Sequence, residues 1–181
     1  MSANTIKYGQ CGPFIMGVRE LKTIKLNPFL LAVVLVALSS PASALHCAPE
    51  KLTGLGTVDL AQFRGRIVYV DYWASWCASC KQSFPFMNDL KKQFESKGVT
   101  VVAISTDKDS KEALEFLNDN KADFIVARDT DSKCRKEFGV KTMPSSYILG
   151  KNGELLHTHK SFVKSDIPAI TKELQALVDK N

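Results

Sequence analysis

The chain has 181 residues, of which 45% are hydrophobic and 24% charged. This composition is typical of one globular domain with an additional segment, and it excludes a disordered, collagen-like or coiled-coil protein. The formal net charge is +5, but residues 1–44 contribute +3 and the longer remainder only +2. Because no basic patch is left in the larger part, the charge pattern argues against nucleic-acid binding.

The N-terminal segment has the pattern of a secretory signal. Three basic residues precede an uninterrupted apolar stretch over 28–38. Its eleven residues fall short of the roughly 20 that a membrane-spanning helix needs. The small residues of Ala42-Ser43-Ala44 follow, so cleavage is predicted after Ala44.

The chain is therefore expected to consist of an N-terminal extension with a signal peptide (1–44) and one domain (45–181). An uncleaved signal, which would leave the protein anchored in the membrane, is the alternative. Lipidation at Cys47 fits less well, because His46 occupies a position where a lipobox has a small residue. Met16 is a second candidate for the true start, since signals usually begin close to their basic region.

Beyond the signal, β-rich runs alternate with segments that have apolar residues at helical spacing. The expected strands are 57–60, 67–72, 99–105, 124–126, 146–149 and 154–158, and the expected helices are 77–94, 109–120, 132–138 and 167–178. Alternating strands and helices predict parallel strands. Asn152-Gly153, between the last two strands, predicts an antiparallel hairpin at the edge of the sheet. The fold class is therefore α/β.

Two cysteines, Cys77 and Cys80, are separated by two residues at the junction of a buried strand and a helix. Unpaired N–H groups and the macrodipole at a helix N-terminus favour the thiolate. Cys77 is predicted to attack a substrate disulfide, and Cys80 to resolve the mixed disulfide. A static disulfide and half of a zinc site are the alternatives. Zinc would need further ligands, and His157, His159 and Cys134 do not supply a convincing set.

The run Ile67–Cys80, IVYVDYWASWCASC, resembles the active-site strand and motif of thioredoxins. Met143-Pro144 and Lys151-Asn152-Gly153-Glu154 extend the resemblance. The export signal and the added segment around 107–131 are similar to the exported TlpA/ResA-like branch. The resemblance spans roughly residues 52–179. It implies a thioredoxin fold, with a central mixed β-sheet flanked by helices and a central helix–strand insertion.

The resemblance also assigns roles to single residues. It implies that Pro144 is a cis-proline beside the dithiol, and that the backbone of Met143 pairs with an extended substrate segment. Asp71 matches a buried acid that assists deprotonation of Cys80, and burial should raise its pKa. Trp76 is expected to shield the dithiol or contact substrate. The alternatives are a trans-proline loop and an Asp71 solvated at a strand end.

Three features depart from the patterns of these relatives. Ala78-Ser79 replaces the Gly-Pro of thioredoxins between the cysteines, and Ser161 stands where the family usually has a glycine near the active-site rim. Many TlpA-like proteins have Asn where this chain has Asp71. Together these differences leave the reduction potential and the shape of the substrate groove open.

Outside the motif, Cys47 and Cys134 remain after signal removal. In an oxidising compartment they could form a structural disulfide, and two free thiols or an intermolecular bridge through Cys47 are the alternatives. His157 and His159 alternate along one strand and share a face. A solvated surface is the expected role of these histidines, with copper or zinc binding as the alternative.

The functional interpretation is an exported thiol–disulfide oxidoreductase, a monomer in the periplasm or another extracytoplasmic compartment. It needs no organic cofactor or metal, because the dithiol carries two electrons. The resemblance implies a reductase of protein disulfides that is fed by a membrane-bound donor and serves cytochrome c or oxidase assembly. The rivals are a disulfide-donating oxidase, a copper-binding metallochaperone-like factor and a non-catalytic binding module. A peroxidase is excluded by the absence of a Pro-x-x-x-Thr-x-x-Cys pattern.

Overall fold

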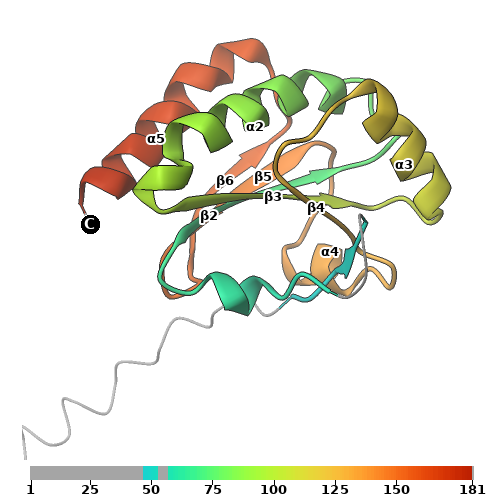
Figure 1. Ribbon diagram of the computed structural model, residues 1–181, viewed down its shortest axis with the longest axis horizontal. Helices are drawn as coiled ribbons and strands as arrows, with labels where there is room; N and C mark the ends of the chain where they lie inside the picture. The colour runs from blue at the N-terminus through green and yellow to red at the C-terminus, as the bar shows by residue number, and fades with distance from the viewer. Residues whose placement is uncertain (1–46, 53–56, 181) are drawn as a thin grey trace, which may run out of the picture. The chain divides into compact units, whose positions relative to one another are not determined.

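The computed structural model describes residues 47–52 and 57–180 (Figure 1). Its elements, in chain order, are β1 (Glu50–Lys51), the 3-10 helix η1 (Leu60–Phe63), β2 (Ile67–Trp73), α2 (Cys80–Phe94), the 3-10 helix η2 (Glu95–Lys97), β3 (Val99–Ser105), α3 (Ser110–Asp119), β4 (Ile125–Arg128), α4 (Lys133–Glu137), β5 (Ser145–Leu149), β6 (Leu155–Lys160), the 3-10 helix η3 (Lys164–Asp166) and α5 (Ile167–Asp179). None of the helices in these ranges is long and apolar enough to cross a membrane. The predicted signal and its cleavage site after Ala44 lie outside the described residues.

The strands form one six-stranded sheet in the order β1-β4-β3-β2-β5-β6. β2 pairs in parallel with β3, and β3 with β4. The hairpin strands β5 and β6 are antiparallel, and β5 joins the sheet antiparallel to β2. The prediction of parallel strands followed by an antiparallel edge hairpin is confirmed. β2 lies inside this sheet, and all seven of its residues are buried.

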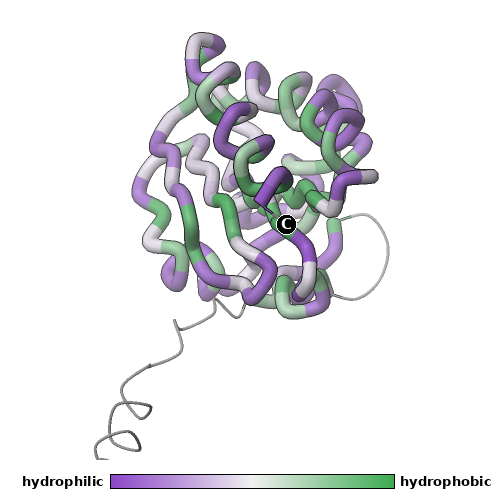
Figure 2. The backbone as a smooth tube through the Cα atoms, turned by 90° about the vertical axis from the view of Figure 1, so that its left-hand side faces the viewer, coloured by the Kyte–Doolittle hydropathy of each residue, from purple (hydrophilic) through white to green (hydrophobic). Residues whose placement is uncertain are grey.

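Helices cover both faces of the sheet, as Figure 1 shows for α2 and α5 on one side and α4 on the other. Alternate residues of β2 serve two cores. Tyr69 and Trp73 face the core formed with α2, α3 and α5, whereas Val70 and Tyr72 face the core formed with η1 and α4. Along the helices in Figure 2, hydrophobic and hydrophilic residues alternate, as amphipathic packing on a sheet requires. The fold is the expected thioredoxin fold, with α3 and β4 as the central insertion.

The segment 57–60, expected as a strand, is not one. Thr57 forms an isolated bridge to Glu50, and the N–H groups of Val58 and Leu60 donate to the carbonyls of Pro49 at 2.7 Å and Cys47 at 2.9 Å, but no continuous strand results. The side chain of Asp59 instead accepts a hydrogen bond from the N–H of Ala61 at 2.9 Å and caps η1. Such a local side-chain acceptor competes with strand pairing. The first strand is the shorter β1, which pairs antiparallel with β4.

The helix expected from Cys77 begins later, at Cys80. A turn closes ahead of it, in which the N–H of Cys77 donates to the carbonyl of Ala74 at 3.0 Å. Cys77 therefore lies in the loop between β2 and α2. The helix ends at Phe94, close to the predicted stop, and Gly98 follows with a φ of 89°.

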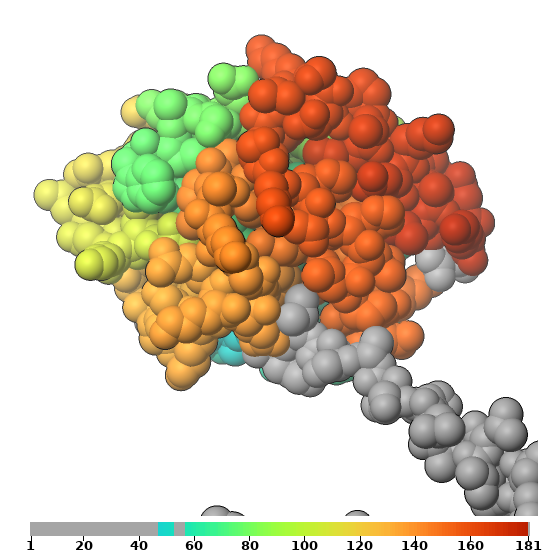
Figure 3. Space-filling view, turned by 180° about the vertical axis from the view of Figure 1, so that it is seen from behind, coloured from blue at the N-terminus to red at the C-terminus, as the bar shows by residue number. Residues whose placement is uncertain are grey.

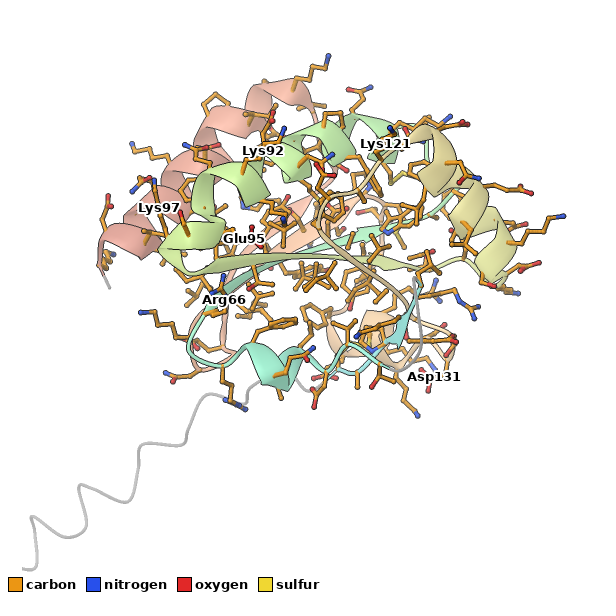
Figure 4. All side chains as sticks on the ribbon, in the orientation of Figure 1. Arg66, Lys92, Glu95, Lys97, Lys121 and Asp131 are labelled. Carbon is orange, nitrogen blue, oxygen red and sulfur yellow. A yellow bond between two sulfur atoms is a disulfide. The ribbon has the colours of Figure 1, made fainter. Side chains whose placement is uncertain are left out.

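Arg66 stabilises the junction after α2, where Figure 4 shows it near Glu95. Its guanidinium donates to the carbonyls of Glu95 at 3.1 Å and Val99 at 2.8 Å. These bonds satisfy carbonyl groups at the point where the helical segment gives way to β3.

On the opposite side of the molecule (Figure 3), the second half of the chain, coloured from yellow to red, forms most of the surface.

Candidate active site

The two motif cysteines form a disulfide at the start of α2. The N–H of Cys80 lies 3.2 Å from Sγ of Cys77 and donates to it, and the Oγ of Ser79 lies 3.5 Å from the same sulfur. A backbone N–H at the N-terminus of α2 therefore points at Sγ of Cys77, although Cys77 itself precedes the helix, and donors of this kind favour a thiolate. Cys77 is 5% exposed and Cys80 fully buried, so Cys77 is the residue of the pair that lies nearer the surface.

Asp71 is buried in the middle of the sheet, paired in register with Ala103 on one side and Ser146 on the other. It is 1% exposed, and its Oδ1 has no hydrogen-bond partner among the described residues. Burial raises the pKa of this carboxyl well above its usual range. By strand alternation it faces the α2 side, as Trp73 does. The alternative of a solvated Asp71 at a strand end does not hold.

The peptide bond between Met143 and Pro144 is cis. Met143 packs against the same core as the dithiol, and its sulfur accepts a weak contact from Oγ1 of Thr106 at 4.0 Å. The carbonyl of Pro144 accepts a hydrogen bond from the N–H of Ser161 at 2.9 Å. Ser161 has a φ of 74°, in the left-handed region that favours glycine, so this chain adopts the backbone that the usual glycine would take.

The two tryptophans near the dithiol occupy different environments. Trp73 is fully buried among Phe84 and Phe116, whereas Trp76 is 72% exposed. Trp76 borders an open hollow of about 320 Å³ next to the dithiol loop. Acidic side chains of α3 line its other side; they are Glu112, Glu115 and Asp119. These acidic residues were not singled out from the sequence, because nothing in the chain pattern placed α3 beside Trp76.

A further residue that the sequence analysis missed is Asp107, whose carboxylate accepts hydrogen bonds from Ser75 in the dithiol loop. A signal for it exists in the sequence. Asp107 lies two residues after the end of the predicted strand 99–105, and carboxyl ends of adjacent parallel strands meet at one edge of the sheet. An acidic residue at that position is therefore expected to lie at the same edge of the sheet as the CxxC motif.

The remaining candidate residues lie elsewhere in the fold. Cys47 and Cys134 form a second disulfide, which decides the alternatives that the sequence left open. His157 Nδ1 and His159 Nε2 both contact Oε2 of Glu173, at 3.4 and 2.9 Å. Within the part of the chain that the structure describes, no three His, Cys, Asp or Glu side chains are arranged to hold a metal ion.

The structure combines a thioredoxin-type sheet with a CxxC disulfide at a helix N-terminus and a cis-proline after Met143, which packs against the core that contains the dithiol. These features define the class of dithiol proteins with a thioredoxin fold. The chain belongs to the Redoxin family, which it matches over residues 38–174.

Individual relatives agree with this assignment. Thiol-disulfide oxidoreductase ResA of Bacillus thuringiensis subsp. konkukian is 29% identical over 103 residues, 57% of this chain and 60% of the relative. ResA of Oceanobacillus iheyensis is 32% identical, over 55% of this chain and 52% of the relative. The match thus spans little more than half the length of these curated relatives.

Among solved structures, one described as thiol:disulfide interchange protein DsbE of Chlorobium tepidum is 36% identical, with a TM-score of 0.72. The match covers 78% of this chain and 99% of the DsbE chain. The exposed lipoprotein thioredoxin Etrx1 of Streptococcus pneumoniae is 23% identical to this chain, with a TM-score of 0.65. The match covers 74% of this chain and 100% of the Etrx1 chain. At this level of identity the similarity supports the fold alone.

Proposed function

We propose that the protein is a thiol–disulfide oxidoreductase that cycles Cys77 and Cys80 between a dithiol and a disulfide. The observation that carries this proposal is the N–H of Cys80 directed at Sγ of Cys77, in a pair that already forms a disulfide. A donor at that distance stabilises negative charge on the sulfur, and the thiolate is the form that attacks disulfides.

The reaction is a pair of thiol–disulfide exchanges. The Cys77 thiolate attacks one sulfur of a client disulfide, and the other client sulfur leaves as a thiolate. Cys80, deprotonated, then attacks Cys77 in the mixed disulfide and releases the second client sulfur. The client gains two electrons and becomes a dithiol. The protein loses two and ends in the disulfide form that the structure holds.

Asp71 is the proposed proton acceptor for Cys80. Both side chains are buried on the α2 side of the sheet. A carboxyl whose pKa burial has raised towards that of a thiol exchanges protons with it more readily than an ordinary aspartate does. Asp71 would thus act in the second exchange, in which Cys80 must lose its proton.

The client is a protein segment that reaches Cys77 beside Met143 and Trp76. The backbone of Met143 precedes the cis-proline and is the proposed pairing site for an extended client chain. Trp76 offers an exposed aromatic surface at the rim. Pro144 shapes the loop, which its carbonyl ties to Ser161.

The proposed setting is extracytoplasmic, with the predicted signal over 1–44 cleaved after Ala44 and residues 45–181 forming the working domain. The protein would act there as a monomeric reductase. A membrane-bound donor would return electrons to Cys77 and Cys80, and the clients would include cytochrome c or oxidase assembly intermediates. The matched relatives named ResA and the DsbE structure support this redox role.

The test is the reduction potential of the Cys77/Cys80 pair, measured by equilibrating the purified protein with glutathione or dithiothreitol. A value near the thioredoxin end, about −270 mV, supports a reductase. A value near about −120 mV would contradict that direction and indicate a disulfide donor. If Cys77 and Cys80 show no reversible dithiol–disulfide equilibrium, the proposed oxidoreductase function is overturned and the copper-binding alternative is favoured.

A further inference from the structure

The loop that carries Cys77 is bound to the end of the neighbouring strand. β2 and β3 run in parallel with Trp73 opposite Ser105, so residues 105–107 and the start of the dithiol loop leave the sheet side by side. The N–H of Thr106 donates to the carbonyl of Trp73 at 2.9 Å. This bond continues the pairing of the two strands by one step beyond β3.

Asp107 extends that attachment through its side chain. The N–H of Ser75 donates to both carboxylate oxygens, at 3.1 Å to Oδ1 and 3.0 Å to Oδ2. The hydroxyl of Ser75 donates to Oδ1 at 2.9 Å, and the hydroxyl of Ser105 donates to Oδ2 at 2.8 Å. Asp107 is 2% exposed, so these donors take the place of water around the carboxylate.

The segment 105–107 also reaches the other loop of the site. Oγ1 of Thr106 contacts both the carbonyl of Trp73 at 3.3 Å and the sulfur of Met143 at 4.0 Å. The end of β3 therefore contacts the loop that bears the nucleophile and the loop that ends in the cis-proline. A shift of Ser75 would move Cys77, two residues later, relative to Met143 and to the N-terminus of α2.

We propose that Asp107 is a positioning residue for the dithiol, which holds the backbone of Ser75 so that Sγ of Cys77 stays aligned with the N–H of Cys80. Asp107 acts through Ser75 and does not itself contact the reacting sulfur. The inference rests on the proposed oxidoreductase function for its biological meaning, but the alignment is a property of the free protein.

The experiment uses the reduced full chain and follows alkylation of Cys77 by iodoacetamide across pH, with the modified peptide identified by mass spectrometry. Asp107→Ala removes the acceptor for Ser75, so the apparent pKa of Cys77 should rise and its alkylation rate at pH 7 should fall about fivefold. Asp107→Asn keeps an amide oxygen that accepts from the Ser75 N–H, and should stay within about twofold of the natural protein.

Asp129→Ala is the matched control. Asp129 is also a buried carboxylate that accepts two backbone N–H bonds, from Cys134 at 3.2 Å and Arg135 at 2.7 Å, but these belong to α4. Its loss should destabilise the fold and leave the Cys77 profile unchanged. The proposal is overturned if Asp107→Ala has the natural profile, if Asp107→Asn falls as far as Asp107→Ala, or if Asp129→Ala shifts the profile equally.

If Asp107→Ala does not fold, as judged by circular dichroism, Asp107→Glu decides the question. Glutamate keeps the charge but places the carboxylate one methylene further from the backbone, out of register with the Ser75 N–H, so the alkylation rate of Cys77 should fall about fivefold, as for Asp107→Ala, whereas an unchanged profile would overturn the proposal. The outcome is separate from the proposed function, because a protein without a reversible couple against glutathione still yields a Cys77 alkylation profile.

Discussion

The N–H of Cys80 donates to Sγ of Cys77 over 3.2 Å, and this contact distinguishes the two cysteines of the motif. Cys77 receives the donor and borders the surface, whereas Cys80 is fully buried within the first turn of α2. These two differences support the proposal that Cys77 is the nucleophile, whose thiolate the helix N-terminus would stabilise, and that Cys80 is the resolving cysteine.

Cys80→Ser should trap a mixed disulfide between Cys77 and a protein client, because the resolving sulfur is gone. Non-reducing electrophoresis with a disulfide-containing client detects the adduct, which dithiothreitol must release. Cys77→Ser should give no adduct and no turnover. An equal yield of adduct from both variants would contradict the assignment of the nucleophile.

Asp71→Asn should change how stability depends on pH. The carboxyl has a raised pKa in the folded state, so between the ordinary aspartate pKa and the raised one the folded state binds a proton that the unfolded state has lost. Stability therefore falls as pH rises through that window, by up to about 1.4 kcal/mol per pH unit. Asp71→Asn removes this fall in stability, so the variant should be more stable than the natural protein at pH 7. Urea unfolding of both proteins from pH 4 to 8 measures the difference. Parallel curves for the two proteins would refute the buried-acid assignment.

The same variant should slow the second exchange. General bases typically contribute about 100-fold or more, so release of the reduced client should fall by about that factor while formation of the mixed disulfide is largely kept. Stopped-flow fluorescence of Trp76 and Trp73, with a single turnover of client, separates the two steps. Slowing of the first step alone would place Asp71 elsewhere in the reaction.

Trp76→Ala should impair client binding without harming the fold. The side chain is 72% exposed, and removal of such a residue usually changes the free energy of unfolding by no more than about 0.5 kcal/mol. KM for a protein client should rise several-fold, whereas reduction of the disulfide by dithiothreitol should keep its rate. Val163→Ala, at another exposed hydrophobic side chain (53%), is the control and should leave KM unchanged.

Replacing both Cys47 and Cys134 by Ala should lower stability and keep the redox activity. The disulfide joins residues 87 apart, and the chain-entropy relation gives about 4.6 kcal/mol for a loop of that length before any strain. Both cysteines are buried in the core on the α4 side, away from the core that contains Cys77 and Cys80. Denaturant unfolding of the oxidised proteins provides the measurement, and an unchanged midpoint would contradict a stabilising role.

Ser161→Gly should stabilise the protein by up to about 1 kcal/mol, because a left-handed backbone costs a non-glycine residue roughly that much. Part of the gain is offset by the greater freedom of glycine in the unfolded chain. Ser161→Ala keeps the strained backbone and should not raise the melting temperature. If the two variants have the same melting temperature, the backbone conformation of Ser161 is not the cause of the stability difference from the natural protein.

Most of the elements could be predicted because their signals are local. The run 99–105 matches β3, and Asn152-Gly153 forms the turn between β5 and β6. The two misassignments also have local causes that the pattern did not reveal. Asp59 caps a 3-10 helix next to the segment 57–60 that was expected as a strand, and the turn at Ala74 delays the start of α2 to Cys80.

The sequence by itself determined the chemistry of this protein, because the CxxC spacing, the buried strand before it and the Met143-Pro144 pair are each contained in a few consecutive residues. Only the tertiary structure decided which distant groups meet. Parallel pairing of β2 with β3 brings Asp107 to Ser75, and packing of the N-terminal segment near α4 brings Cys47 to Cys134. The physical reason is that such contacts depend on the register and packing of whole elements, which no local stretch of the chain encodes.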